Sequence, residues 1–435
     1  MGRKISSLLR LKESVIRRAV IVVLLTMPGF VLNYALYLGA GKLLDIKEFG
    51  IFYTAISFLN FLSAPAVFVG FFYSRQITKI LTFSGIAPAI NEFRGIISLA
   101  QRWGGLGTIA LFITLLILGH FFGVKSLILI ILLVLTNYGN YLVEAVRIGF
   151  QGLQMFIWFG IASLVWMMLR FTFSMAGLYF GGSVWSGVLG ILLSTIPIFF
   201  GSYHLITRQA PVKSILVPRL SLNGRHLLKI LASFGAFATI MYIDVLQAYI
   251  SMDETALGIY SASSVLPKSI IIISMPAARV LFPIMVSTQS TGQSQKKNVL
   301  KGLLLSFLLS GAGAAILILF DELFCNSSIG INSCNPALMS ILACSAIPIC
   351  LLRVMVLLQF ARGLDWHPLL LVFPVTVYLG YVTIAMPDTN DFAWTYLAFL
   401  CITLAIYAAA CLKWSTIWNS LLSILAKYRL FVLYK

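Results

Sequence analysis

Four cations and two carboxylates lie inside long apolar segments of this sequence, where charged side chains are uncommon. They are Arg170, Lys268, Arg279 and Arg353, with Glu144 and Asp244. A charge at the centre of a bilayer costs about 2.5–3.5 kcal/mol or more, so such residues face a polar interior or pair with one another. We therefore expect the four cations to line a central cavity, where they can bind an anionic group.

Two of these cations share one predicted helix. Lys268 and Arg279 are 11 residues apart, which at about 100° per residue leaves them within about 20° on one face and roughly 16 Å apart along the axis. This spacing predicts cations at two depths of the cavity. The alternative is that each side chain extends to the nearer membrane surface. Arg353 can also pair with a carboxylate on another helix.

The two carboxylates have different surroundings in the sequence. Glu144 lies three residues before Arg147, which is the spacing of an ion pair within one helix. Asp244 has no such neighbour. It is therefore either an ion-coupling residue, which binds a proton or a sodium ion, or the counter-charge of one of the buried arginines.

The composition shows what kind of protein must position these residues. Of 435 residues, 60% are hydrophobic and 10% charged, and the mean hydropathy is +0.99. Soluble domains carry about 25% charged residues, so the chain is expected to be an all-α integral membrane protein. This excludes a conventional cytoplasmic enzyme, a secreted disulfide scaffold and a receptor with a large ectodomain.

Hydropathy predicts about twelve transmembrane helices. The expected spans are 19–41, 50–74, 104–123, 124–146, 155–177, 184–204, 229–251, 257–287, 301–321, 336–360, 367–387 and 393–412. With the amino end inside, the inner segments hold 24 Lys and Arg and the outer segments only three. Because cytoplasmic loops carry the excess of Lys and Arg, both termini are expected in the cytoplasm of a bacterial inner membrane protein. The basic balance thus reflects topology, and no nucleic acid is expected as a partner.

The two halves of the chain repeat one pattern. An acidic stretch followed by Gly-Ile-aromatic begins at Asp45 and again at Asp253, 208 residues later. Six spans return a chain to its starting side, so the repeat predicts two six-helix bundles of equal orientation around a central cavity, as in transporters with parallel repeats. The expected parts are an amphipathic segment 1–18, bundles 19–205 and 229–412, a basic linker 206–228 and an amphipathic tail 413–435.

Three segments give the chain a family resemblance. The stretch around Gly50, the segment 146–156, and residues 243–245 through 258–263 to 281–283 resemble the Wzx-type polysaccharide transporters of the multidrug/oligosaccharidyl-lipid/polysaccharide (MOP) flippase superfamily. The resemblance implies alternating access and movement of undecaprenyl-pyrophosphate-linked oligosaccharide, a repeat unit of O-antigen, capsule or exopolysaccharide, to the outer leaflet. It implies membrane lipids, a polysaccharide polymerase and a chain-length regulator as partners.

Two other functions remain open at this point. One is a cation-coupled exporter of small amphipathic compounds from the same superfamily, and the other is a non-transporting subunit of an exopolysaccharide synthase. No enzymatic activity, cofactor or metal site is expected, since no G-x-x-x-x-G-K-[ST] motif and no histidine pair with ligand spacing occurs. Cys325 and Cys334 share one outer loop. A disulfide between them is possible in an oxidising compartment.

Overall fold

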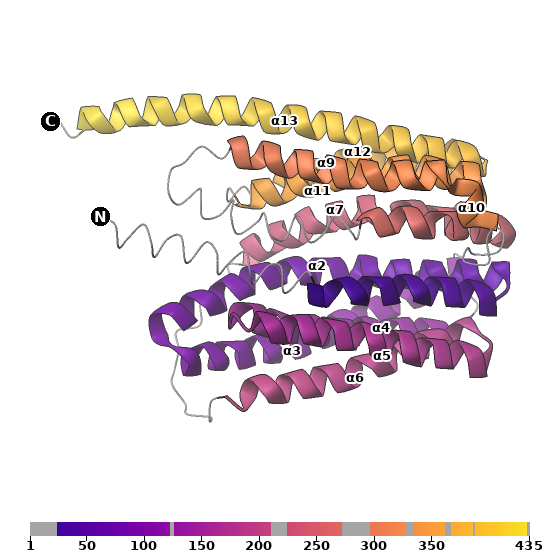
Figure 1. The fold of residues 1–435 in the computed structure, drawn as a ribbon. Helices are drawn as coiled ribbons and strands as arrows, with labels where there is room; N and C mark the ends of the chain where they lie inside the picture. The colour runs from indigo at the N-terminus through magenta and orange to yellow at the C-terminus, as the bar shows by residue number, and fades with distance from the viewer. Residues whose placement is uncertain are drawn as a thin grey trace.

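The computed structural model describes residues 24–121, 126–209, 224–271, 296–326, 334–361, 367–385 and 388–432. These residues are helical almost throughout, and they contain no strand. Figure 1 shows the helices running side by side along one direction in two groups, which we call the first half (residues 24–209) and the second half (residues 224–432).

The described part of the first half contains six long helices. These are Leu24–Leu43, α2 (Ile46–Ser84), α3 (Ile86–Phe121), α4 (Leu127–Gly152), α5 (Phe156–Gly181) and α6 (Val184–Thr207). The second half contains α7 (Gly224–Ser251), a helix over 254–271, α9 (Lys296–Leu319), α10 (Asp321–Asn326), α11 (Pro336–Ala361), the 3₁₀ turn η1 (His367–Leu371), α12 (Val372–Ala385) and α13 (Thr389–Val432). Helices α2 and α7 pack together at the boundary between the halves.

The helices correspond to the predicted spans in number and order. Among the described residues, eight helices are long and apolar enough to cross a membrane. The other four predicted spans correspond to α2, α7, the helix 254–271 and η1 with α12. Large apolar side chains such as Ile109, Leu308 and Phe200 are exposed on the outside of the helices, as in a protein surrounded by lipid. The chain is thus a polytopic all-α membrane protein.

Several boundaries differ from the expected ones. Helix α2 has 39 residues and extends beyond the predicted span 50–74 at both ends. Helix α13 has 44 residues, so the last predicted span and most of the predicted tail form one continuous helix. The expected segment 1–18 and residues 210–223 of the expected linker lie outside the described residues.

Short polar residues start and separate the helices. Asp45 begins α2, where its carboxylate accepts the backbone N–H of Glu48 at 2.7 Å, and Asn335 begins α11 by accepting the N–H of Leu338 at 3.2 Å. Such side chains satisfy the free N–H groups of a first helical turn. Gly182, with φ 54°, closes α5 in the left-handed conformation that favours glycine. Neighbouring helices can therefore turn back directly on one another.

The packing of the halves differs between the two ends of the bundle. One core joins both halves and contains Leu36, Phe52 and Val188 of the first half together with Ile240 and Tyr260 of the second. A separate core lies within the other end of the first half, formed by residues such as Ile77, Phe93, Val146, Phe159 and Ile206. The two halves therefore share their core at the end where α2 begins.

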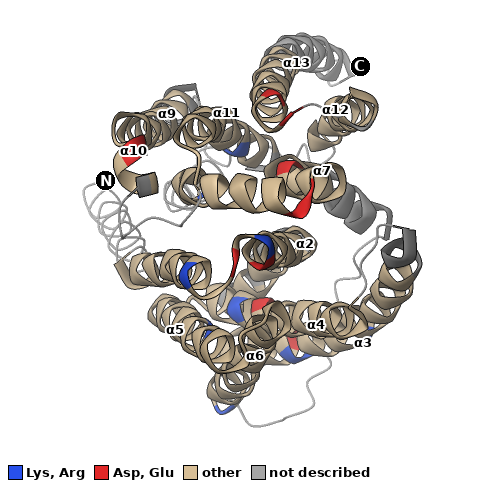
Figure 2. Cartoon of the chain, turned by 90° about the vertical axis from the view of Figure 1, so that its right-hand side faces the viewer, with Lys and Arg blue, Asp and Glu red and all other residues tan. Residues whose placement is uncertain are grey.

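The repeated segments meet at this shared end. A Cβ atom added to Gly50 would lie 2.9 Å from the backbone nitrogen of Gly258, its counterpart in the repeat. At this position the backbones are so close that a side chain at either glycine requires the helices to move apart. Beside this contact, Lys47 Nζ lies 3.9 Å from Glu254 Oε2. Figure 2 views this end of the molecule, with acidic residues on α2, α10 and α13.

Candidate functional site

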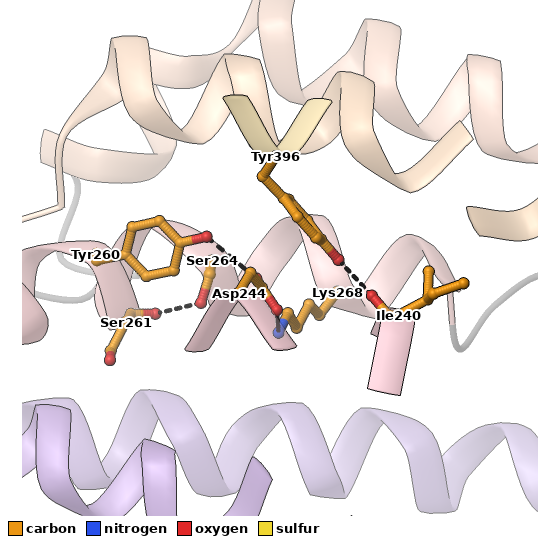
Figure 3. A network of polar contacts seen from close by, with 7 residues as sticks. All are labelled: Ile240, Asp244, Tyr260, Ser261, Ser264, Lys268 and Tyr396. Carbon is orange, nitrogen blue, oxygen red and sulfur yellow. Dashed lines mark hydrogen bonds and ion pairs between the residues drawn. The ribbon is translucent and has the colours of Figure 1, made fainter. Parts of the chain in front are cut away.

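The best-defined charged group in the interior is the carboxylate of Asp244, on α7 near its Ser251 end. Its side chain is 0% exposed, and both oxygens are hydrogen-bonded. Lys268 Nζ donates to Oδ1 at 2.8 Å, and Tyr260 Oη donates to Oδ2 at 3.1 Å. Figure 3 shows both side chains reaching Asp244 from the helix 254–271. A buried carboxylate needs such partners, because an uncompensated charge in a low-dielectric interior is costly.

Lys268 is the more accessible member of this ion pair. Its side chain is 15% exposed, and its Nζ also lies 5.6 Å from the centre of the Tyr242 ring. Tyr242 is two residues before Asp244 on α7, so the lysine is held between a carboxylate and an aromatic face. The lysine does not extend toward a membrane surface. Of the alternatives drawn from the sequence for Lys268, the structure supports a place in the polar interior.

Three further tyrosine hydroxyls lie within electrostatic range of Asp244. Tyr53 of α2, Tyr378 of α12 and Tyr396 of α13 all lie close enough for the charge of Asp244 to act on their hydroxyls. Tyr396 Oη donates to the carbonyl of Ile240 at 2.8 Å, one turn before Asp244 (Figure 3). The site is therefore built by helices from both halves.

Arg170 contributes a second cation from the first half. It lies on α5, is 6% exposed, and has Tyr37 and Tyr242 within electrostatic range. Its Nε has no hydrogen-bond partner among the described residues, and no carboxylate there forms an ion pair with it. Tyr37 in turn lies edge-on to Tyr53, with ring centres 5.3 Å apart. Arg170 thus brings an unneutralised charge to the boundary between the halves.

Arg353 of α11 is the third buried cation, with 6% exposure. Its Nη1 donates to the carbonyl of Ile271 at 2.9 Å, and its Nη2 lies 3.3 Å from Met241 Sδ. The two alternatives drawn from the sequence for Arg353, a membrane surface or a carboxylate on another helix, are both wrong within the described residues.

Tyr242 connects these groups, although the sequence analysis did not single it out. The charges of Arg353, Arg170 and Asp244 act on its hydroxyl, as does Tyr37, and Lys268 lies over its ring. Among the described residues, three cations and one carboxylate therefore act on Tyr242, which leaves an excess of positive charge around it. In the sequence, the signal that could have pointed to Tyr242 is its position two residues before Asp244, a carboxylate within an apolar segment.

The other candidate residues lie elsewhere. Glu144 pairs with Arg147 on α4, and the guanidinium of Arg147 lies 5.0 Å from the Phe159 ring centre and 5.6 Å from that of Trp166. This pair is buried in the first half, away from the group around Tyr242. Its position matches the local ion pair that the spacing predicts. Arg279 lies outside the described residues.

The sequence left two alternatives for Asp244, an ion-coupling residue or the counter-charge of a buried arginine. In the structure its ion-pair partner is Lys268 and not an arginine. The two residues are 24 positions apart on different helices, so the contact depends on how α7 and the helix 254–271 pack. Cys325 and Cys334 form a disulfide between α10 and α11, outside the site. Within the described residues, no group of three or more His, Cys, Asp or Glu side chains could hold a metal ion.

No protein-family model and no curated protein matches the sequence. Solved structures do resemble the fold. One is the outward-facing conformation of a multidrug resistance MATE family transporter of the MOP superfamily. Its sequence is 15% identical to this one, the match covers 93% of this chain and 96% of that chain, and the TM-score is 0.70. A second is the inward-facing conformation of such a transporter. Its sequence is 16% identical, the match covers 93% of this chain and 99% of that chain, and the TM-score is 0.60.

A MATE structure in the straight conformation is 15% identical and covers 95% of this chain and 97% of that one, with a TM-score of 0.67. At these identities the likeness shows the fold. The chain therefore has the fold of these MATE transporter structures over nearly its whole length. These structures are of MATE transporters, so they do not test the resemblance of three sequence segments to Wzx-type transporters.

Proposed function

We propose that the chain moves an amphiphile with an anionic head group across a bacterial inner membrane by alternating access of its two halves. The observation that carries this proposal is the excess of buried cations at the boundary between the halves. Among the described residues, Arg170, Lys268 and Arg353 act on Tyr242, and Asp244 neutralises only one of them. Buried cations are costly in a membrane interior unless an anion offsets them, so their surplus favours an anionic load.

A lipid-linked oligosaccharide fits this arrangement. Its pyrophosphate diester carries two negative charges, which equals the surplus left by three cations and one carboxylate. Arginine binds phosphate oxygens in a bidentate manner and lysine binds them as a point charge. The tyrosine and serine hydroxyls beside the cations are suitable partners for sugar hydroxyls, while a polyprenyl tail can remain in the surrounding lipid.

A cation-coupled exporter of small amphipathic compounds, toxic cations among them, is the second candidate, and the likeness to structures of a multidrug resistance MATE family transporter favours it. Such a load would need a buried carboxylate that is not already neutralised. In the described interior, Asp244 is bonded to Lys268 and Glu144 to Arg147. A non-transporting subunit of an exopolysaccharide synthase is the third candidate, with the same fold and no movement of substrate.

Reconstitution separates the three candidates. The purified chain is placed in vesicles with a fluorescent polyprenyl-pyrophosphate oligosaccharide in the inner leaflet, and its appearance outside is followed by an impermeant quencher. We expect movement by the wild type, a loss of about tenfold or more with Arg170→Ala, and no change with Lys47→Ala, whose side chain is 54% exposed. Wild-type vesicles that export a lipophilic cation but leave the oligosaccharide in place would favour the second candidate. Vesicles that move neither compound would favour the third candidate.

The orientation in the membrane has a separate test. We propose that the end with the shared core faces outward, since the outer segments are predicted to be poor in Lys and Arg. A cysteine replacing exposed Asn390, beside the start of α13, should react with an impermeant thiol reagent added outside. One replacing exposed Gln209, after the end of α6, should react only in opened membranes. The reverse labelling would invert the proposed topology.

A further inference from the structure

We propose that Asp244 is a proton-binding counter-ion for Lys268: when an anionic head group binds to Lys268, Asp244 takes up one proton from solution. The inference rests on the proposed function, because it takes from it an anion that reaches this lysine. It goes beyond that function in two respects: one proton is taken up when the anion binds, and Asp244 is the residue that binds this proton. In the empty state, the ammonium of Lys268 and the carboxylate of Asp244 neutralise each other at 2.8 Å.

The first step of the argument is accessibility. The side chain of Lys268 is 15% exposed and that of Asp244 is 0% exposed, so a ligand approaches the pair from the lysine side. The ammonium has three N–H donors, of which Asp244 uses one. An anion can therefore bind to Lys268 before the existing ion pair has separated.

The second step is electrostatic. An anion in contact with the same ammonium brings a negative charge close to the carboxylate of Asp244, and the pair is almost fully removed from water. A nearby like charge favours the neutral form of a carboxyl group. Desolvation strengthens this effect, because opposing charges are screened less in a low-dielectric interior.

The third step concerns the other neighbours of Asp244. They are Tyr242 on α7, Tyr260 and Lys268 on the helix 254–271, Tyr53 on α2, Tyr378 on α12 and Tyr396 on α13. Apart from the lysine, all of these are neutral hydroxyls, so none can replace its charge. Arg170 and Arg353 act on the neighbouring Tyr242, but among the described residues neither forms an ion pair with Asp244. When the anion takes over Lys268, a proton is the available compensation for Asp244 among the described groups.

The protonated state also has a satisfactory structure. A proton bound to one carboxyl oxygen forms one O–H bond, and no other bond changes. Tyr260 Oη lies 3.1 Å from Oδ2, and a phenolic hydroxyl both donates and accepts hydrogen bonds. The neutral carboxyl therefore keeps a partner after Lys268 has turned to the anion. With Asp244 neutral, the three cations Arg170, Lys268 and Arg353 face the two negative charges of the ligand.

The test measures protons with a ligand that does not titrate. Dimethyl pyrophosphate, a diester whose charge is constant near neutral pH, is titrated into the purified full chain by calorimetry in buffers of different ionisation enthalpy. We expect the wild type to take up about one proton per ligand, and its affinity to rise as the pH falls, by up to about tenfold per pH unit. Asp244→Asn should bind at least as tightly, with no proton uptake and no pH dependence.

Two further variants complete the test. Glu254→Gln removes a carboxylate that is 68% exposed at the outer end, and it should behave as the wild type. Lys268→Arg should keep both binding and proton uptake, because the cation remains. If Asp244→Asn cannot be recovered in folded form, the infrared difference spectrum of the wild type should gain a protonated-carboxyl band when the probe binds.

The outcomes distinguish the two proposals. Binding by the wild type without proton uptake, or equal uptake by Asp244→Asn, overturns the counter-ion role and leaves the proposed function standing. A wild type that binds no dimethyl pyrophosphate and moves no lipid-linked oligosaccharide overturns both. Proton uptake that disappears with Asp244→Asn alone supports the inference.

Discussion

Two buried ion pairs, one in each half, have the same chemistry but are built in different ways. Glu144 and Arg147 lie one helical turn apart on α4, with side chains 13% and 11% exposed. Asp244 and Lys268 come from two helices and are 0% and 15% exposed. A pair within one helix is fixed by the geometry of that helix, whereas a pair between two helices can separate when the helices or a ligand change. We infer that the first pair serves structure and the second serves substrate binding.

The largest expected effect is on the stability of the first half. Arg147→Met leaves Glu144 without its cation between buried helices, and removing one partner of a buried pair costs about 3–5 kcal/mol. Thermal unfolding in detergent should show the loss. The double variant Glu144→Gln with Arg147→Met should recover most of it. Protein that remains fully stable with Arg147→Met would remove the structural half of the comparison.

The second expected effect is on transport. Lys268→Met removes the cation that faces the ligand, and transport should fall about a hundredfold, equivalent to about 2.7 kcal/mol. Because Asp244 can take up a proton, the protein should still be present in the membrane at near-normal abundance. Flipping rates per folded molecule give the measurement, with the Glu144→Gln, Arg147→Met double variant as the control that stays active. Equal losses in both would mean that the two pairs do not differ in role.

The sequence predicts the first of these pairs better than the second, and the reason is physical. A spacing of three residues on a helix implies contact, so Glu144 and Arg147 could be paired from the sequence. Asp244 could be identified as a residue that needs a partner, but its partner depends on the packing of two helices. Tyr242 was not identified, since a tyrosine in an apolar segment is common and its place two residues before Asp244 does not show which cations the fold brings near it.

The fold itself was more predictable than the site. The number and order of the long helices follow from hydropathy. The lengths of α2 and α13 were missed because a helix can continue beyond the apolar region when its residues still favour helix. The contact between Gly50 and Gly258 was not predicted either, although both residues belong to the repeat from which two bundles were inferred.

The third expected effect tests whether the boundary between the halves is as tightly packed as the cores within them. Gly50→Ala introduces a methyl group 2.9 Å from the backbone of Gly258, and overpacking of this kind costs about 1–3 kcal/mol. Cysteines replacing Lys47 and Glu254 should then cross-link more slowly than in the parent protein. Gly95→Ala on α3 is the matched control, since a methyl group there meets no atom within 4 Å. Unchanged cross-linking with Gly50→Ala would show that the two helices are already mobile at this point.

The smallest expected effect adds a third ion pair to the comparison. Lys47 and Glu254 join the halves at 3.9 Å, but their side chains are 54% and 68% exposed. Exposed pairs contribute about 0–1 kcal/mol, so Lys47→Gln should change thermal stability and flipping by amounts near the limit of detection. A loss comparable to that of Lys268→Met would show that charge alone, without burial, controls the site.

The glycine contact has a consequence for the substitutions that this chain tolerates. In a dimer of two identical half-length chains, a residue that touches its own counterpart lies on the two-fold axis. One base change at that glycine would add two methyl groups at a single crowded point. In the present chain Gly50 and Gly258 are encoded separately, so each can change while the other stays small. A single chain that carries both glycines thus leaves this contact open to single, asymmetric substitutions.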